Sequence, residues 1–233
     1  MKKMLRFFII VALLIMFFGY SANASILTYD TRTAFYADLS ALGYVDRQTL
    51  GFDGQTAGSL IPSGGTVGGA TFSYSIPGYQ IKVDNLFDTT SPDNYIGLNN
   101  SEGAFIYGDS FVMTFDRTIH ALGLYLVAEP GAVWAGDFEL STVGGSAFNS
   151  DTPDPAFSLS DGDAFFIGLI QTDFKLGFSS AALSGTLDPD LVNYVFNVDD
   201  ITSAVNPVPV PAPLLLLGAG LVSLIGIRRK LGN

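Results

Sequence analysis

Residues 111–127, FVMTFDRTIHALGLYLV, contain two apolar runs separated by a short polar segment. The runs at residues 111–115 and 121–127 are rich in aromatic and branched side chains, and neither shows a helical period. Short apolar runs bounded by polar or turn-forming residues are typical of β-strands. We therefore expect one strand in each run.

The same pattern recurs through most of the chain and predicts an all-β fold. Turn-forming segments such as Gly64-Gly65 and Gly144-Gly145 separate the apolar stretches. Many short strands with turns at such intervals favour an antiparallel β-sandwich, and the 21 glycines of residues 25–206 fit it better than a helical bundle. The further predicted strands lie at residues 49–52, 70–76, 79–83, 104–106, 137–142, 164–169, 174–178 and 194–201.

One short helix is predicted at the start of this body, over residues 31–42. Asp30 is a residue type that caps helix N-termini, and Gly43 is the type that ends helices. Between them, Phe35, Leu39 and Leu42 fall on one face, as in an amphipathic helix.

Charge and cysteine content exclude several classes of function. Residues 25–206 hold all 22 acidic residues but only five of the 11 basic ones, which leaves a net charge of −17. Phosphate binding needs a basic face, so nucleic acid is not expected as a partner. The chain has no cysteine, which excludes disulfides and thiolate metal sites. No linker divides residues 25–206, so we expect a single domain.

Residues 1–24 have the layout of a secretory signal peptide. A basic start precedes twelve apolar residues at 7–18, and the segment ends in Ala22-Asn23-Ala24. As a helix, the apolar run would be about 18 Å long, against a hydrocarbon core of roughly 30 Å. A cleavable signal is therefore favoured over a permanent anchor, with the mature chain beginning at Ser25.

Residues 207–233 form a second predicted targeting signal, at the C-terminal side of the body. Alternate prolines cannot continue a helix, so the start of this tail should be an extended spacer. Residues 214–227 are apolar and would make a short transmembrane helix of about 21 Å. The proline-rich motif consists of Val208, Pro209, Val210, Pro211, Ala212 and Pro213. The tail ends in three basic residues, Arg228, Arg229 and Lys230. We expect these to act as a stop-transfer cluster that stays in the cytoplasm.

This tail resembles the C-terminal sorting signal of PEP-CTERM proteins, in a Val-Pro-x-Pro-Ala variant. The resemblance implies that an exosortase-type membrane protease recognises the motif and removes the tail during export through the inner membrane. It also implies a Gram-negative bacterium that makes extracellular polysaccharide. Val210 and Ala212 stand where the family has Glu, a departure that bears on the identity of the processing enzyme. A plain tail anchor is the alternative, although such anchors are usually nearer 20 apolar residues.

Short motifs within the body also follow a familiar order. Their order is similar to that of many PEP-CTERM bodies, and the resemblance implies a jelly-roll-like sandwich. The motifs are DTR at residues 30–32, GFDG at 51–54, GGATF at 68–72, ALGLY at 121–125, FIG at 166–168 and VDDI at 198–201.

Asp199 and Asp200, in the last predicted strand, are candidate calcium ligands, because calcium takes six to eight oxygen ligands in flexible geometry. Jelly-roll carbohydrate modules often use an acidic residue there, and Asp53 in the GFDG turn could contribute. The alternative is that strand alternation points one Asp to solvent while the other caps a turn. Calcium is thus a possible cofactor and not a required one.

Trp134 is the one tryptophan of the chain and a candidate for stacking on a sugar, with Asp137 nearby to bind hydroxyls. The alternative is that it lies in the core. His120 is the one histidine of the chain. The chain has no G-x-S-x-G motif to supply a serine nucleophile beside it, so we expect a surface or strand-end role for His120. Carboxylates are abundant, but no pair is placed as a glycosidase requires.

Taken with both ends, these observations predict an exported, non-enzymatic cell-envelope or matrix protein, located at the cell surface or secreted after processing. Its expected partners are an exosortase-type protease, extracellular polysaccharide and, transiently, the inner membrane. A calcium-dependent carbohydrate-binding module and a secreted glycan hydrolase are the alternatives.

Overall fold

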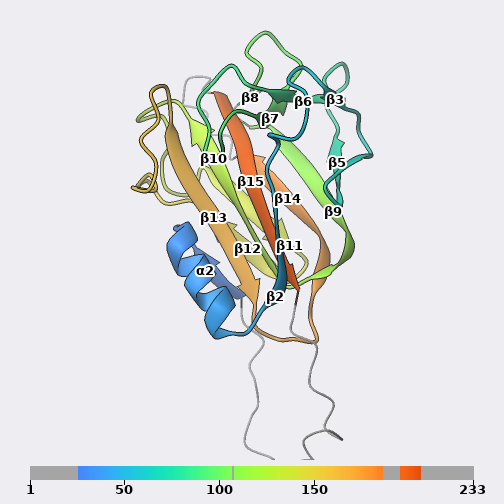
Figure 1. Ribbon diagram of the computed structural model, residues 1–233, viewed down its shortest axis with the longest axis vertical. Helices are drawn as coiled ribbons and strands as arrows, with labels where there is room; N and C mark the ends of the chain where they lie inside the picture. The colour runs from blue at the N-terminus through green and yellow to red at the C-terminus, as the bar shows by residue number, and fades with distance from the viewer. Residues whose placement is uncertain (1–25, 107, 186–194, 206–233) are drawn as a thin grey trace, which may run out of the picture.

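The computed structural model describes residues 26–106, 108–185 and 195–205. The predicted signal peptide, residues 1–24, and the predicted sorting signal, residues 207–233, lie outside the described residues. Within the described part, the chain is mostly strand with one helix, and two antiparallel sheets pack face to face (Figure 1). The predicted all-β sandwich with one early helix is confirmed at this level.

The first sheet is built around a central antiparallel trio, β13, β10 and β15. The strand β2 (Val45–Leu50) and the short strand β8 (Phe105–Ile106) also pair with β15. The order of the first sheet is β1 (Ile26–Tyr29), β13 (Asp163–Gln171), β10 (Ala121–Ala128), β15 (Val195–Val205), β7 (Tyr95–Leu98), β6 (Ile81–Asp84) and β3 (Leu60–Ile61).

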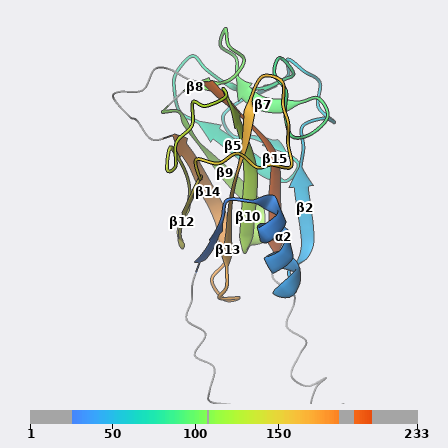
Figure 2. The same ribbon diagram turned by 90° about the vertical axis from the view of Figure 1, so that its left-hand side faces the viewer.

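The second sheet lies behind the first in the view of Figure 1, and Figure 2 shows the two layers from the side. Its order is β12 (Gly145–Phe148), β11 (Phe138–Thr142), β14 (Phe178–Gly185), β9 (Ser110–Ile119), β5 (Ala70–Tyr74) and β4 (Gly65–Val67).

Strand alternation separates two cores. In β9, Phe111, Met113 and Phe115 face the first sheet and are buried, whereas Val112 is exposed. In β10 every residue is buried, because the strand is covered on both faces. Its residues Leu122, Leu124 and Leu126 join the main core between the sheets, and the intervening Ala121, Tyr125 and Val127 join a second core on the outer face.

The second core is covered by the helix α2 (Arg32–Ala41), whose Phe35 and Leu39 are buried. Phe35 lies over a pair of facing glycines, Gly123 and Gly168, which leave room for it and for Phe166. The predicted cap is wrong by one residue. Thr31 is the N-cap, although it makes no side-chain capping bond, and Asp30 lies one position before it.

Two strand predictions are also corrected. Residues 174–178 are mostly a turn, in which Asp173 Oδ1 accepts a hydrogen bond from the Lys175 N–H at 2.9 Å. A strand begins only at the end of that range and continues to Gly185 as β14. The predicted strand 49–52 overlaps only the end of β2, which begins at Val45. The short strands β1, β3, β4, β7 and β12 were not predicted.

The described chain begins and ends at the same end of the first sheet. Ile26 of β1 pairs with Gln171 of β13. The Gln171 N–H donates to the His120 carbonyl at 2.7 Å, and the His120 N–H donates to the Ala204 carbonyl at 2.9 Å. We call this the terminal end. The opposite end of the sandwich carries the short strands β3, β6, β7 and β8 (Figure 1).

Candidate functional site

The predicted site residues Asp199 and Asp200 lie at a β-bulge in β15. The pairing with β10 shifts register between Gly123 and Tyr125, so that Asp200 and Ile201 together oppose one residue of β10. Asp200 has a φ of 49°, which is uncommon for a residue other than glycine. Because of the bulge, Ile201 lies in the main core while the carboxylates of Asp199 and Asp200 lie on the outer face of the sheet.

Asp199 is fully buried and acts as an acceptor for the segment 89–91. Its Oδ2 accepts hydrogen bonds from Thr89 Oγ1 at 2.7 Å, from Thr90 Oγ1 at 3.2 Å and from the Ser91 N–H at 2.9 Å. Its Oδ1 accepts one from the Asp200 N–H at 2.7 Å. Burial raises the pKa of Asp199, and these hydrogen bonds oppose the rise.

Asp200 pairs with the helix. Its Oδ2 lies 3.3 Å from Arg32 Nη1, and the Arg32 guanidinium also lies over the rings of Tyr125 and Phe157, at 5.3 and 5.2 Å from their centroids. Burial and then the neighbouring Asp199 charge raise the pKa of Asp200 to about 6, and Arg32 opposes this rise.

Asp53 comes close to Asp200 from the GFDG turn. Its Oδ1 accepts hydrogen bonds from the Asp93 and Asn94 N–H groups, both at 3.0 Å. Asp53 Oδ2 and Asp200 Oδ1 each lie 3.7 Å from the place where a Cβ on Gly51 would stand. The structure therefore brings the carboxylates of Asp53 and Asp200 to one spot beside Gly51.

The donors around these carboxylates do not fit a calcium site made by all three. Asp199 faces hydrogen-bond donors, which a cation would repel, and Arg32 already balances the charge of Asp200. Among the described residues, no group of three or more His, Asp or Glu side chains is placed to hold a metal ion. Calcium binding therefore stays a prediction without support from this geometry.

Trp134 has an exposed side chain, with 58 % of its surface accessible, and is not a core residue. Asp137 is buried, and its Oδ2 accepts a hydrogen bond from the Trp134 N–H at 2.7 Å. Asp137 therefore holds the turn that carries Trp134, and its role in binding sugar hydroxyls stays a prediction. Sugar stacking on Trp134 stays a prediction.

His120 lies between the ends of β9 and β10 and is mostly buried, with its ring 6.4 Å from that of Tyr44. Burial lowers its pKa. Its backbone joins β13 to β15 at the terminal end. This is the strand-end role that the sequence suggested.

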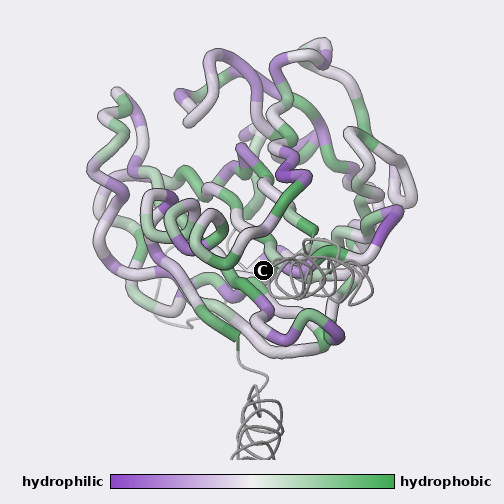
Figure 3. Tube along the Cα trace, turned by 60° about the horizontal axis from the view of Figure 1, so that its bottom comes forward, coloured by the Kyte–Doolittle hydropathy of each residue, from purple (hydrophilic) through white to green (hydrophobic). Residues whose placement is uncertain are grey.

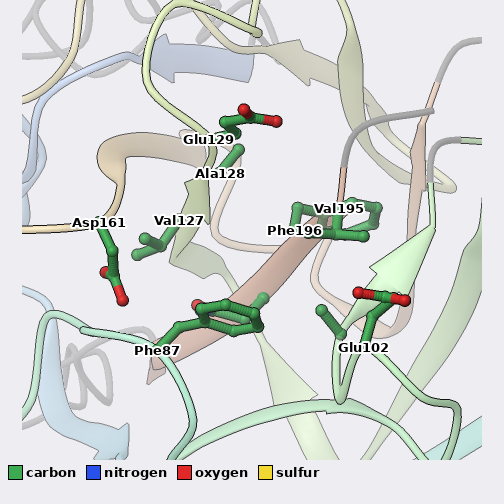
Figure 4. A pocket seen from close by; sticks show the side chains of 10 residues that line it. Phe87, Glu102, Val127, Ala128, Glu129, Asp161, Val195 and Phe196 are labelled. Atoms are coloured by element: carbon green, nitrogen blue, oxygen red, sulfur yellow. The ribbon is translucent and has the colours of Figure 1, made fainter. Parts of the chain in front are cut away.

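The sequence did not indicate a cavity of about 260 Å³ at the opposite end of the sandwich (Figure 4). It lies where β10 ends and β15 begins, and loops from three other parts of the chain complete it. The residues that matter for its chemistry are Phe87, Glu102, Glu129, Asp161, Phe196 and Asn197. No local motif joins them, because they are brought together only by the packing of separate segments.

No protein-family model matches this chain, and no curated protein matches its sequence. Among the described residues, no helix is both long and apolar enough to cross a bilayer.

Proposed function

We propose that this chain is an exported, non-enzymatic protein of the cell envelope or extracellular matrix, in a Gram-negative bacterium that makes polysaccharide. Its tail is processed by an exosortase-type protease, and its body, a jelly-roll-like sandwich, associates with extracellular glycan. The observation that supports this proposal best is the position of the terminal end relative to the cavity.

The terminal end and the cavity lie at opposite ends of the same strand. The β10 strand begins at Ala121, next to His120, and finishes at Ala128, which lines the cavity. Seven residue steps at about 3.3 Å separate these two points by roughly 23 Å. A body held to the inner membrane through its tail would therefore direct the cavity away from the lipid and toward the extracytoplasmic space.

The terminal end also carries exposed apolar side chains. Val143 is 92 % exposed, and Phe174 and Leu176 are about half exposed, at 47 % and 51 %. Val143 and Leu176 line one shallow depression together with Ile26, the first described residue. Figure 3, with this end turned forward, shows apolar segments in green among polar ones. Contact with a lipid surface during tethering would cover these side chains.

A secreted glycan hydrolase is the second candidate, and one observation favours it. Glu102, Glu129 and Asp161 all line the cavity, and glycosidases use a pair of carboxylates. Incubating the purified chain with polysaccharide and measuring reducing ends separates the two functions. If the wild-type chain releases sugar and the Glu102→Gln or Glu129→Gln variant does not, the chain is a hydrolase and the non-enzymatic proposal is refuted.

The sorting proposal is tested by fractionation in a polysaccharide-producing host, with and without its exosortase. We expect the body in the matrix fraction when the exosortase is present and a longer precursor in the inner membrane when it is absent. The variant with Pro209, Pro211 and Pro213 all changed to Ala should behave like the host without exosortase. Unchanged release in both cases would refute processing at this tail.

A further inference from the structure

The cavity at the far end of β10 is strongly acidic. Glu102, Glu129 and Asp161 approach it from three different segments, and the described residues of its lining include no Lys, Arg or His. Figure 4 shows the three carboxylates around its rim. A half-open site of this charge attracts cations and repels anions.

Asn197 is a second, independent feature of the cavity that points to a ligand with a hydrogen-bond donor. Its side chain is on the outer face of the first sheet, because it pairs across the strands with Val127 of the second core, and both residues line the cavity. Asn197 is only 2 % exposed, yet its Oδ1 has no hydrogen-bond partner. Leaving a buried acceptor unpaired is unfavourable, so a ligand that donates a hydrogen bond to this amide oxygen would be stabilised.

An aromatic ring completes the site. Phe87 is half-buried and lines the cavity, and its ring stacks on the buried Tyr95 at 6.3 Å between centroids with an interplanar angle of 28°. Tyr95 therefore fixes the orientation of Phe87. An aromatic face of this kind accepts the C–H face of a sugar ring or a cationic group.

The two loops that carry Phe87 and Asp161 are locked together by hydrogen bonds. The Asp88 N–H donates to Asp161 Oδ1 at 3.0 Å. In return, Asp88 Oδ2 accepts from the Ser160 N–H at 2.7 Å and from Ser160 Oγ at 2.5 Å. This reciprocal arrangement holds the cavity wall in place before any ligand arrives, which lowers the entropy lost on binding.

These features select among ligand classes. A metal ion does not fit, because the described carboxylates form no group of three that could hold one. A neutral sugar would supply donors for Asn197 but would gain no attraction from the three carboxylates, which are exposed at the rim. An amino sugar supplies N–H donors, a positive charge and an apolar ring face in a single unit. The volume, near the lower bound of roughly 300 Å³ for ligand pockets, suits one such ring.

We infer that this cavity binds a protonated amino-sugar residue of an extracellular glycan, with the amino group between Asn197 and the carboxylates and the ring against Phe87. The inference rests on the proposed glycan association and adds the class of sugar.

Calorimetric titration of the purified full-length chain in detergent tests it. Oligosaccharides of glucosamine are compared with N-acetylglucosamine and glucose oligosaccharides of equal length, and spermidine serves as a cation that is not a sugar. We expect glucosamine oligosaccharides to bind at least about tenfold more tightly than either matched sugar and more tightly than spermidine. Affinity should fall as rising pH deprotonates the amino groups.

Variants locate the binding in the cavity. The pair Glu102→Gln with Glu129→Gln, and separately Asn197→Leu and Phe87→Ala, should each weaken binding about tenfold or more. Glu139→Gln and Phe148→Ala, on β11 and β12 of the second sheet, are the matched controls and should not change it. A melting temperature for each variant verifies that it folds.

Other outcomes overturn the inference in different ways. Equal affinity for acetylated or neutral oligosaccharides would refute the role of charge while leaving the proposed glycan association standing. Tighter binding of spermidine would indicate a cation site without sugar recognition. Binding that survives all cavity variants would place the sugar elsewhere. Failure to bind any of these sugars, together with failure to retain the host's own polysaccharide, would refute both the inference and the proposed function.

Discussion

Arg32 Nη1 lies 3.3 Å from Asp200 Oδ2, which joins the first turn of α2 to the bulge of the last strand across 168 residues of sequence. The Tyr36 hydroxyl, one helical turn further along, shares a hydrogen bond of 3.0 Å with Thr202 Oγ1. The helix is therefore attached to β15 by two polar contacts in addition to the apolar packing of Phe35. The carboxylate at the bulge has a structural partner, and its titration should be visible in the stability of the fold.

Asp200→Asn should remove a pH dependence of stability. Because the pKa of Asp200 is about 6 in the folded chain and 3.8 ordinarily, the folded state holds a proton between these values that the unfolded state has released. Wild-type stability should therefore fall as pH rises from about 4 to about 6. At pH 7 the variant should be more stable by about 1–3 kcal/mol, and Asn tolerates the positive φ.

Urea unfolding of the full-length chain between pH 4 and pH 7.5 measures this difference. Asp46→Asn, at the other positive-φ aspartate, is the control, because Asp46 is exposed and pairs with Arg117 at the surface. A variant of Asp200 that is less stable than wild type at pH 7 would mean that the Arg32 ion pair outweighs the cost of burial.

Gly123→Ala should destabilise the contact between the helix and the sheet. A Cβ at Gly123 would lie 2.5 Å from Phe166 Cζ and 3.2 Å from Phe35 Cε1, so both rings would have to move. Overpacking of this kind costs about 1–3 kcal/mol. Thermal or urea unfolding measures the loss.

Gly54→Ala is the matched control for this substitution, because nothing lies within 4 Å of its added Cβ. A double variant with Phe166→Leu should recover part of the lost stability. Equal stability of Gly123→Ala and wild type would show that the rings over the facing glycines are not closely packed.

Calcium and magnesium at equal concentration should raise the melting temperature equally, through screening of the acidic surface. The donors around Asp199 and the pairing of Asp200 with Arg32 support this expectation. Melts with chelator alone and with magnesium or calcium chloride added at equal concentration provide the measurement. If calcium raises the melting temperature more than magnesium does, and the difference disappears in Asp53→Asn, the chain has a calcium site that includes Asp53.

Replacing the apolar side chains of the terminal end should weaken contact with lipid. The triple variant of Val143, Phe174 and Leu176, each changed to Ser, removes three exposed side chains, and burying each one is worth about 1.5–3 kcal/mol at most. We expect reduced retention of the released body on zwitterionic vesicles in a flotation assay. Phe148→Ser, an equally exposed side chain on β12, is the control. No difference between the triple variant and the control would argue against a lipid-facing role.

Local pattern was sufficient to predict the sandwich and the helix. The alternation of Phe111, Met113 and Phe115 places one face of β9 in the core, and the continuous apolar run of β10 is explained by cover on both faces. Strand predictions were wrong where the local sequence signals were ambiguous. Residues 174–178 are aromatic and apolar at both ends, yet Asp173 makes the turn that delays the strand to Phe178. The sequence also named Asp53, Asp199 and Asp200, but not their partners.

The sequence by itself determined the features that depend on neighbours along the chain: strand periodicity, turns, the helix and the net charge. Only the tertiary structure decided which side chains share a surface. Glu102 and Asp161 line one cavity with Asn197 although many residues separate them along the chain. Arg32 meets Asp200 only because α2 packs over β13 and β10, and β15 is the neighbour of β10 in the sheet. Such contacts depend on strand order and register, which arise from burial of the whole core and leave no local signal in the chain.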